Sequence, residues 1–106
     1  MKVLYKAPKK SPRTKNFSRR DYFNHELTMY GLCDEYEIES GHHLVMLYNG
    51  DIPMNERQNF TVHADSSLFC GTIFVVEKRE DGSYAGLSDT TREVAYDWIR
   101  NKCSWI

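Results

Sequence analysis

The chain has 106 residues, of which 41% are hydrophobic and 27% are charged, and its formal net charge at pH 7 is −1. This length suits one domain, residues 1–106, and no apolar run approaches the roughly 18 residues that a membrane span needs. The first lysines are not followed by the apolar stretch of a secretory signal. Three cysteines without C-x-x-C spacing argue against a disulfide scaffold, so we expect a cytoplasmic protein with no membrane partner.

The N-terminal part of the sequence predicts a strand followed by a loop. The β-branched and aromatic residues of Met1–Lys6 are typical of a strand. Pro8 and Pro12 bracket a polar stretch, which predicts a loop over Ala7–Asn16. This loop lies within residues 7–17, a segment that we regard as a candidate for flexibility.

A first helix is predicted over Arg19–Tyr30. Ser18 is a suitable N-cap, and Asp21 places a negative charge in the first turn, where the helix dipole favours it. Gly31 follows as a residue that commonly ends helices. The positions expected to face the core are Tyr22, Phe23, Leu27, Met29 and Tyr30.

Four segments in the middle of the chain have strand patterns. Cys33–Ser40 alternates acidic and apolar residues, which predicts a half-buried strand with its carboxylates in water. Leu44–Tyr48 is an apolar run ended by a turn dipeptide, which predicts a strand buried on both faces. Gly71–Val76 has the same character, and Phe60–Val62 is a candidate short strand.

The C-terminal part predicts a hairpin and a second helix over residues 89–103. Asp81-Gly82 is a strong hairpin signal that turns the chain back towards Tyr84–Leu87. The helix is capped either by Ser88 or by a capping box of Thr90 and Glu93. Its apolar stripe is Val94, Ala95, Trp98 and Ile99. The expected fold class is α+β, with a mostly antiparallel sheet packed by helices at about 19–30 and 89–103.

The sequence shows no pattern of a catalytic or cofactor site. The histidines are scattered without the short spacings of zinc ligands: His25, His42, His43 and His63. Cys70 and Cys103 lie in apolar surroundings and are predicted to be small buried side chains. Phosphate-binding glycine motifs are missing as well. We therefore expect a non-enzymatic protein with no metal and no cofactor.

Six aromatic residues are too many to bury fully in a domain of this size: Tyr22, Tyr30, Tyr36, Tyr84, Tyr96 and Trp105. Because tyrosine, tryptophan and arginine dominate protein interfaces, some of these side chains are candidates for a protein-binding patch. The loop Pro53–Arg57 has two interpretations. It is either a rigid connection or a preorganised loop in which Asn55, Glu56 and Arg57 grip a partner.

Charge is distributed unevenly along the chain. Residues 1–20 carry eight basic residues and no acid, whereas the remainder carries six basic residues and all fifteen acids. This basic segment folds back on the acidic body or is simply solvated, or else it contacts nucleic acid or an acidic partner surface. The candidate phosphate-binding residues are Lys9, Lys10, Arg13, Lys15, Arg19 and Arg20.

Several short motifs occur in a recognisable order. They are Met1–Leu4, Leu44–Asn49, Ile52–Arg57, Gly71–Val76 and Gly86–Asp89. Together they resemble a family of small uncharacterised proteins encoded by phages, plasmids and conjugative elements. In that family the asparagine and arginine of the proline-containing loop are usually adjacent, whereas here Glu56 separates Asn55 from Arg57. The family has no assigned activity, catalytic residue or cofactor.

The resemblance implies an accessory protein of a mobile element in the cytoplasm of a bacterial host. By analogy, we expect it to bind a host protein or nucleoprotein, as an inhibitor of a defence system of the anti-CRISPR or anti-restriction type. The acidic strand would then face a basic channel of the target with Asp34, Glu35, Glu37 and Glu39. The alternative is a nucleic-acid-binding accessory or regulatory protein that uses the basic N-terminal segment.

Overall fold

The structure is a computed structural model that describes residues 1–38, 42–53 and 57–105. Its elements, in chain order, are β1 (Lys2–Lys6), β2 (Arg13–Asn16), α1 (Arg20–Tyr30), β3 (Asp34–Glu37), β4 (Leu44–Tyr48), β5 (Gln58–Val62), β6 (Leu68–Cys70), β7 (Ile73–Lys78), β8 (Tyr84–Ala85), α2 (Asp89–Lys102) and β9 (Cys103–Trp105).

The strands form two sheets in which every pair is antiparallel. The larger sheet has the order β2-β1-β7-β4-β3, and β8 also pairs with β7. The smaller sheet has the order β6-β5-β9. With two helices and a mostly antiparallel sheet, the predicted α+β class is confirmed.

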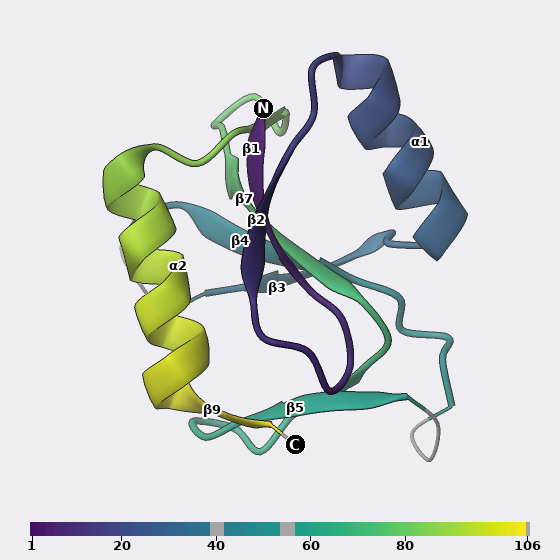
Figure 1. Ribbon diagram of the computed structural model, residues 1–106, viewed down its shortest axis with the longest axis vertical. Helices are drawn as coiled ribbons and strands as arrows, with labels where there is room; N and C mark the ends of the chain where they lie inside the picture. Colours follow the sequence, from purple (N-terminus) through teal and green to yellow (C-terminus); the bar gives the residue numbers. More distant parts are fainter. Residues whose placement is uncertain (39–41, 54–56, 106) are drawn as a thin grey trace.

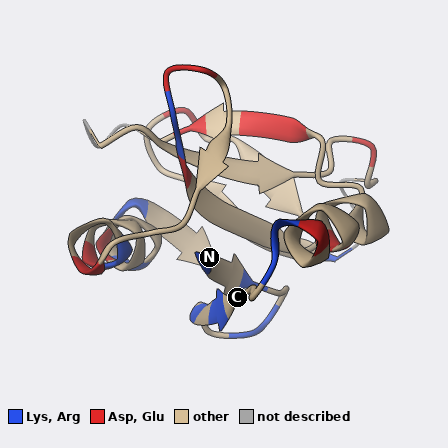
Figure 2. Ribbon diagram, turned by 90° about the horizontal axis from the view of Figure 1, so that it is seen from above, with Lys and Arg blue, Asp and Glu red and all other residues tan. Residues whose placement is uncertain are grey.

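Helices α1 and α2 lie on opposite faces of the larger sheet, as Figures 1 and 2 show. The central strands β4 and β7 are therefore covered on both sides. Leu44 and Met46 face the core that contains α2, whereas Val45 and Leu47 face the core that contains α1. All four side chains are buried, which confirms the prediction that this run is buried on both faces.

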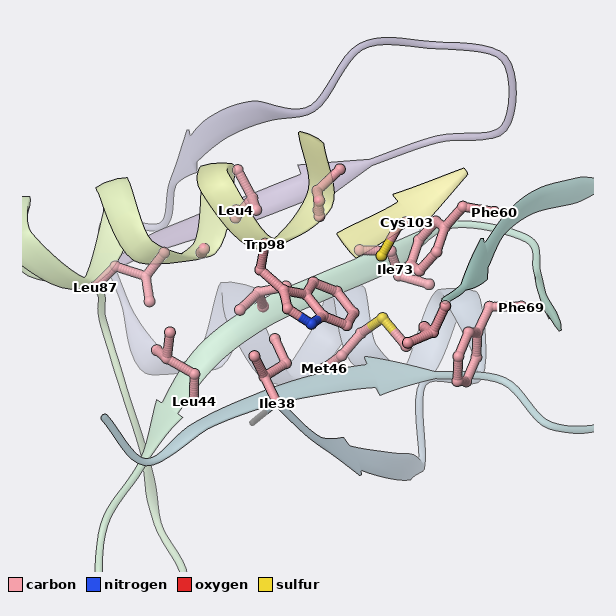
Figure 3. Close-up of a cluster of buried hydrophobic side chains, with 14 residues drawn as sticks. Leu4, Ile38, Leu44, Met46, Phe60, Phe69, Ile73, Leu87, Trp98 and Cys103 are labelled. Carbon is pink, nitrogen blue, oxygen red and sulfur yellow. The ribbon is translucent and has the colours of Figure 1, made fainter. Parts of the chain in front are cut away.

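The core beneath α2 also holds the smaller sheet in place. Trp98 of α2 packs edge-on against Phe60 of β5, with ring centroids 6.0 Å apart. Phe69 of β6 packs edge-on against Tyr48 at 4.9 Å and lies 5.7 Å from Phe60. Figure 3 shows Trp98, Phe60 and Phe69 between α2, β4 and the smaller sheet. One aromatic cluster thus fixes the second sheet against the first.

The core beneath α1 is smaller and is also aromatic. Phe23, the one buried residue of α1, packs edge-on against Phe17 at 5.4 Å and stacks on Phe74 of β7 at 6.2 Å. Leu27 and Tyr30 are partly buried against the same core, whereas the prediction that Tyr22 and Met29 face it is wrong, because both are exposed.

Helix α1 differs from its prediction at its start. It begins at Arg20 with Arg19 as N-cap, and no side chain accepts a hydrogen bond from the first turn. The prediction that Ser18 caps this helix is therefore wrong. Gly31 ends the helix in a left-handed conformation with φ 65°, and its N–H donates to the carbonyls of Leu27 and Thr28, as expected of this residue.

Helix α2 begins as one of the two predicted alternatives. The Ser88 hydroxyl accepts from the N–H of Thr91, and the Thr91 hydroxyl accepts from the N–H of Ser88. The capping box therefore uses Ser88 with Thr91, and not Thr90 with Glu93. Within the described part of the chain, neither helix has the length and apolar character that crossing a membrane requires.

The predicted loop over Ala7–Asn16 is wrong in its second half, because Arg13–Asn16 forms β2. This strand pairs with β1, and Leu4 lies opposite Thr14. Its residues are all polar, so no apolar alternation marks it in the sequence. It is stabilised by the backbone ladder and by side-chain contacts such as the hydroxyls of Thr14 and Tyr96, 3.4 Å apart.

One charged side chain is enclosed where the two sheets meet. Lys6, at the end of β1, is 0% exposed, and its Nζ donates to Oδ1 of Asn59 at 2.5 Å. The Asn59 amide donates in turn to the carbonyls of Lys6 and Gly71. The ammonium lies 4.5 Å from the ring centroid of Trp105, a cation–π distance. Burial lowers the pKa of Lys6 to about 8.

This lowered pKa predicts a pH-dependent stability. A lysine in the unfolded chain stays protonated up to its ordinary pKa of 10.5, so between about 8 and 10.5 the unfolded chain binds more protons than the native one. The contribution of Lys6 to the free energy of unfolding should therefore rise across this window, by about 3 kcal/mol. Urea denaturation of the wild type and of Lys6→Met at several pH values measures the difference.

In Lys6→Met this contribution should be lost, whereas Lys102→Met, which removes an exposed lysine, should keep it. Subtracting the stability profile of Lys6→Met from that of the wild type removes the contributions of tyrosines and cysteines that titrate in the same pH range. Parallel profiles for the wild type and Lys6→Met would contradict the assignment to Lys6.

Candidate functional site

The acidic strand β3 forms one edge of the larger sheet, with its carboxylates partly engaged inside the protein. The Asp34 carboxylate accepts from the N–H of Gly50 at 2.9 Å and so fixes the turn after β4. Glu37 is exposed, and no hydrogen bond or ion pair to its side chain is found within the described residues. Glu39, the fourth predicted acid, lies outside the described residues.

Glu35 is held by two side chains from the β7–β8 hairpin. Lys78 Nζ lies 2.7 Å from Glu35 Oε2, and the Tyr84 hydroxyl donates to Glu35 Oε1. These two hydrogen bonds, that of Lys78 first, lower the pKa of Glu35. Burial, followed by the bond to Glu35, raises the pKa of Tyr84 to about 12. Of the three described acids, only Glu37 is therefore unengaged.

A cavity of about 380 Å³ lies beside Glu37 and has walls of mixed charge. Its lining residues are Glu35, Glu37, His43, Leu44, Val45, Lys78, Arg79 and Glu80. Because both acids and bases line it, this cavity does not present the continuous negative surface that a mimic of nucleic acid needs.

The predicted loop site is described only at Arg57, because Asn55 and Glu56 lie outside the described residues. Arg57 is exposed and adopts a left-handed conformation with φ 49°. Its carbonyl accepts from the N–H of Gly71 at 2.8 Å. A cavity of about 650 Å³ adjoins it, lined by Pro8, Thr28, Met29, Tyr30, Gly31, Asn49, Ile52, Arg57, Gly71 and Thr72.

The basic N-terminal segment forms the β1–β2 hairpin and leads into α1, and its charges other than that of the buried Lys6 lie at the surface. Lys9 and Lys10 lie exposed in the connection between the strands. The Arg13 guanidinium lies 5.3 Å from the ring centroid of Tyr5. Lys15 pairs with Glu26 of α1, with Nζ and Oε1 3.3 Å apart. Lys2 pairs with Asp89 of α2, with Nζ and Oδ1 3.6 Å apart, so within the described residues the segment folds back on the acidic body through Lys2 and Lys15.

Arg19 and Arg20 lie apart from the hairpin charges, at the start of α1. They line a cavity of about 250 Å³ together with Arg79, which follows β7. Arg79 was not predicted from the sequence, because it lies sixty residues from Arg19 and in a run of mixed charge. The pairing of β1 with β7 brings the two segments together.

The two charged strands lie at opposite edges of one sheet. β2 carries Arg13 and Lys15, whereas β3 carries Asp34, Glu35 and Glu37. Figure 2 shows the acidic strand on the side of the molecule opposite the basic hairpin. The small net charge thus conceals a separation of positive and negative surfaces.

The remaining candidates for a chemical role are the cysteine thiols and the residue types that bind metals. Cys70 and Cys103 are buried, as predicted, and burial raises the pKa of the Cys103 thiol to about 12. A thiol of this kind forms little of the nucleophilic thiolate near neutral pH. Among residues 1–38, 42–53 and 57–105, no three histidine, cysteine or acidic side chains lie close enough to hold a metal ion.

The Glu35 contacts predict a titration shift. In Lys78→Met the pKa of Glu35 should rise most, and in Tyr84→Phe it should rise less, because the Lys78 bond is the larger cause. Titration of the carboxyl carbon by NMR measures both. Tyr22→Phe, at an exposed tyrosine of α1, is the control and should leave the pKa of Glu35 unchanged. A larger shift in Tyr84→Phe than in Lys78→Met would reverse the assignment.

Comparisons of this chain with protein-family models, with curated proteins and with solved structures gave no match. The resemblance to proteins of phages and plasmids therefore stays a prediction.

Proposed function

We propose that this protein acts without catalysis, by binding nucleic acid through its basic hairpin and the start of α1. The observation that supports the proposal is which charged side chains are paired within the protein and which are not. Five of the six predicted bases form no ion pair within the described residues: Lys9, Lys10, Arg13, Arg19 and Arg20. Two of the three described acids of β3 are, by contrast, engaged internally.

Unpaired surface bases suit a partner that supplies closely spaced negative charge. Lysine and arginine that neutralise phosphates release condensed counterions, which favours binding at low salt. The positive groups lie on two neighbouring structural units, the β1–β2 hairpin and the helix that follows it. They are therefore presented on a folded surface and not on a free tail. Such contacts position a protein on the phosphate backbone without reading sequence.

A second candidate is a protein inhibitor of a host defence system, of the anti-CRISPR or anti-restriction type. The observation that favours it is Glu37, unengaged at a free sheet edge, together with Tyr22 and Met29 of α1, each 57% exposed. The resemblance to proteins of mobile elements supplies the setting of a bacterial cytoplasm. Both candidate functions would apply if the target is a nucleoprotein.

Binding of labelled double-stranded DNA, measured by fluorescence anisotropy at several salt concentrations, tests the first candidate. The slope of log K against log salt is about −0.9 per phosphate contact. Lys9→Gln/Lys10→Gln should therefore make the slope less negative by about 2. The control Arg100→Gln/Lys102→Gln removes two exposed charges from α2 and should leave the slope unchanged. Equal slopes in both double variants would refute the hairpin as the binding surface.

Recovery of host proteins from a lysate, with and without nuclease, separates the two candidates. Nucleic-acid binding predicts that recovered material is lost on digestion and is reduced in Lys9→Gln/Lys10→Gln. The inhibitor hypothesis predicts one defence protein in a fixed ratio, which survives nuclease and is lost in Glu37→Gln. Survival in both variants would argue against both proposed surfaces.

A further inference from the structure

A second basic site lies on the α1 side of the molecule, away from the hairpin tip. It is the cavity of about 250 Å³ between the start of α1 and the β7–β8 connection. Three arginines line it: Arg19 and Arg20 from one segment, and Arg79 from the other. Two segments far apart in the sequence thus bring three guanidinium groups to one hollow.

The rest of the lining contains hydrogen-bonding groups and no acid. Its other residues are Met1, Phe17, Ser18, Phe23, Asn24, Ser83 and Tyr84. Phe17 and Phe23 are buried and form an apolar floor. The Ser18 hydroxyl and the Asn24 amide can donate hydrogen bonds to an oxygen-rich anion, whereas the hydroxyls of Ser83 and Tyr84 already donate to Asp81 and Glu35.

The arginines are not neutralised by ion pairs within the described residues. Asp81 is close enough to Arg79 and Arg20 for their charges to act on it, and it accepts from the N–H and the hydroxyl of Ser83. These bonds, and more weakly Arg79 and Arg20, lower the pKa of Asp81. Asp81 is thus oriented by Ser83 and does not line the cavity, so the positive charge inside it stays in excess.

Both segments that carry the arginines are fixed by the backbone. The Arg79 N–H donates to the Ser83 carbonyl at 2.8 Å, and the Arg79 carbonyl accepts from the Gly82 N–H at 2.9 Å. On the other wall, α1 begins without a side-chain cap, so its positive end adds to the field of the guanidinium groups. The backbone that carries Arg79 is thus fixed, while the side chains of the three arginines are exposed to solvent.

We propose that this cavity binds one phosphate group, held by Arg79 together with Arg19 and Arg20. Guanidinium groups match phosphate oxygens with two parallel hydrogen bonds, which lysine does not provide. The inference deepens the proposed function and rests on it for its biological ligand, a phosphate of nucleic acid. It adds Arg79, a residue outside the basic N-terminal segment, to the binding surface.

Inorganic phosphate is the first probe, added to the full chain at low ionic strength and followed by NMR of the backbone amides. The amides around Arg79 and at the start of α1 should shift together in a saturable way. A hydrogen bond to a charged group contributes about 1.5–3 kcal/mol, so Arg79→Gln should raise the phosphate Kd about 10- to 100-fold. Arg100→Gln, on α2, is the matched control and should leave the Kd unchanged.

Two further variants separate failure of this site from failure of the proposed function. Lys9→Gln/Lys10→Gln should weaken DNA binding and keep the wild-type Kd for phosphate. Arg79→Lys keeps the charge but not the paired geometry, so its Kd should lie between those of the wild type and Arg79→Gln. If phosphate binds and DNA does not, the proposed function fails and the site stands.

Oligonucleotides with a 5′-phosphate or a 5′-hydroxyl distinguish the two sources of the phosphate. A preference for the 5′-phosphate that Arg79→Gln abolishes assigns the site to a strand end. Equal affinities that fall equally in Arg79→Gln assign it to the backbone. An unchanged phosphate Kd in Arg79→Gln overturns the inference, and circular dichroism of the variant confirms that the comparison is made between folded proteins.

Discussion

The pairing of β4 with β7 is the constraint on which the rest of this structure depends. Met46 lies opposite Val75 in the middle of the pair, and both are buried. Since burying one such side chain contributes about 1.5–3 kcal/mol, a strand pair that is apolar on both faces needs cover on both sides. Helix α1 supplies it on one face, and α2 with the smaller sheet supplies it on the other. The two-sided fold follows from these two strands.

Because the central strands β4 and β7 are covered on both faces, the strands richest in charge lie at the edges of the sheet. Strands β2 and β3 are short and carry the charged side chains, a pattern that also discourages pairing between sheet edges of different molecules. Among the described residues Lys6 is the one charged residue that is buried, and it lies where the two sheets meet. Its ammonium is accommodated by Asn59 and the Trp105 ring, and its pKa is lowered there. The edges, and not the core, therefore carry the features available to a partner.

Elements whose pattern comes from burial were predictable from the sequence, whereas those fixed by tertiary contacts were not. Leu44–Tyr48 was predictable because a short apolar run that ends at a turn dipeptide is typical of a buried strand. Strand β2 was not predictable, because its residues are all polar and show no apolar alternation. It is formed by pairing with β1, which the sequence does not mark. The enclosure of Lys6 and the approach of Arg79 to Arg19 arise from sheet order, which a single sequence does not reveal. The candidate site was thus predictable in its N-terminal half only.

The two charged edges of the sheet differ in how far their side chains are paired within the protein. If the charged side chains at both edges of the sheet were equally free to meet solvent, the net charge of −1 would describe the charge that a partner meets. Two of the three acids of β3 instead bond within the protein, Asp34 to the turn after β4 and Glu35 to Lys78. Most bases of the hairpin and of α1 find no such partner among the described residues. Exposed ion pairs contribute little to stability, so the unpaired bases cost the fold little. They remain available to an external anion, whose negative charge the protein does not supply itself.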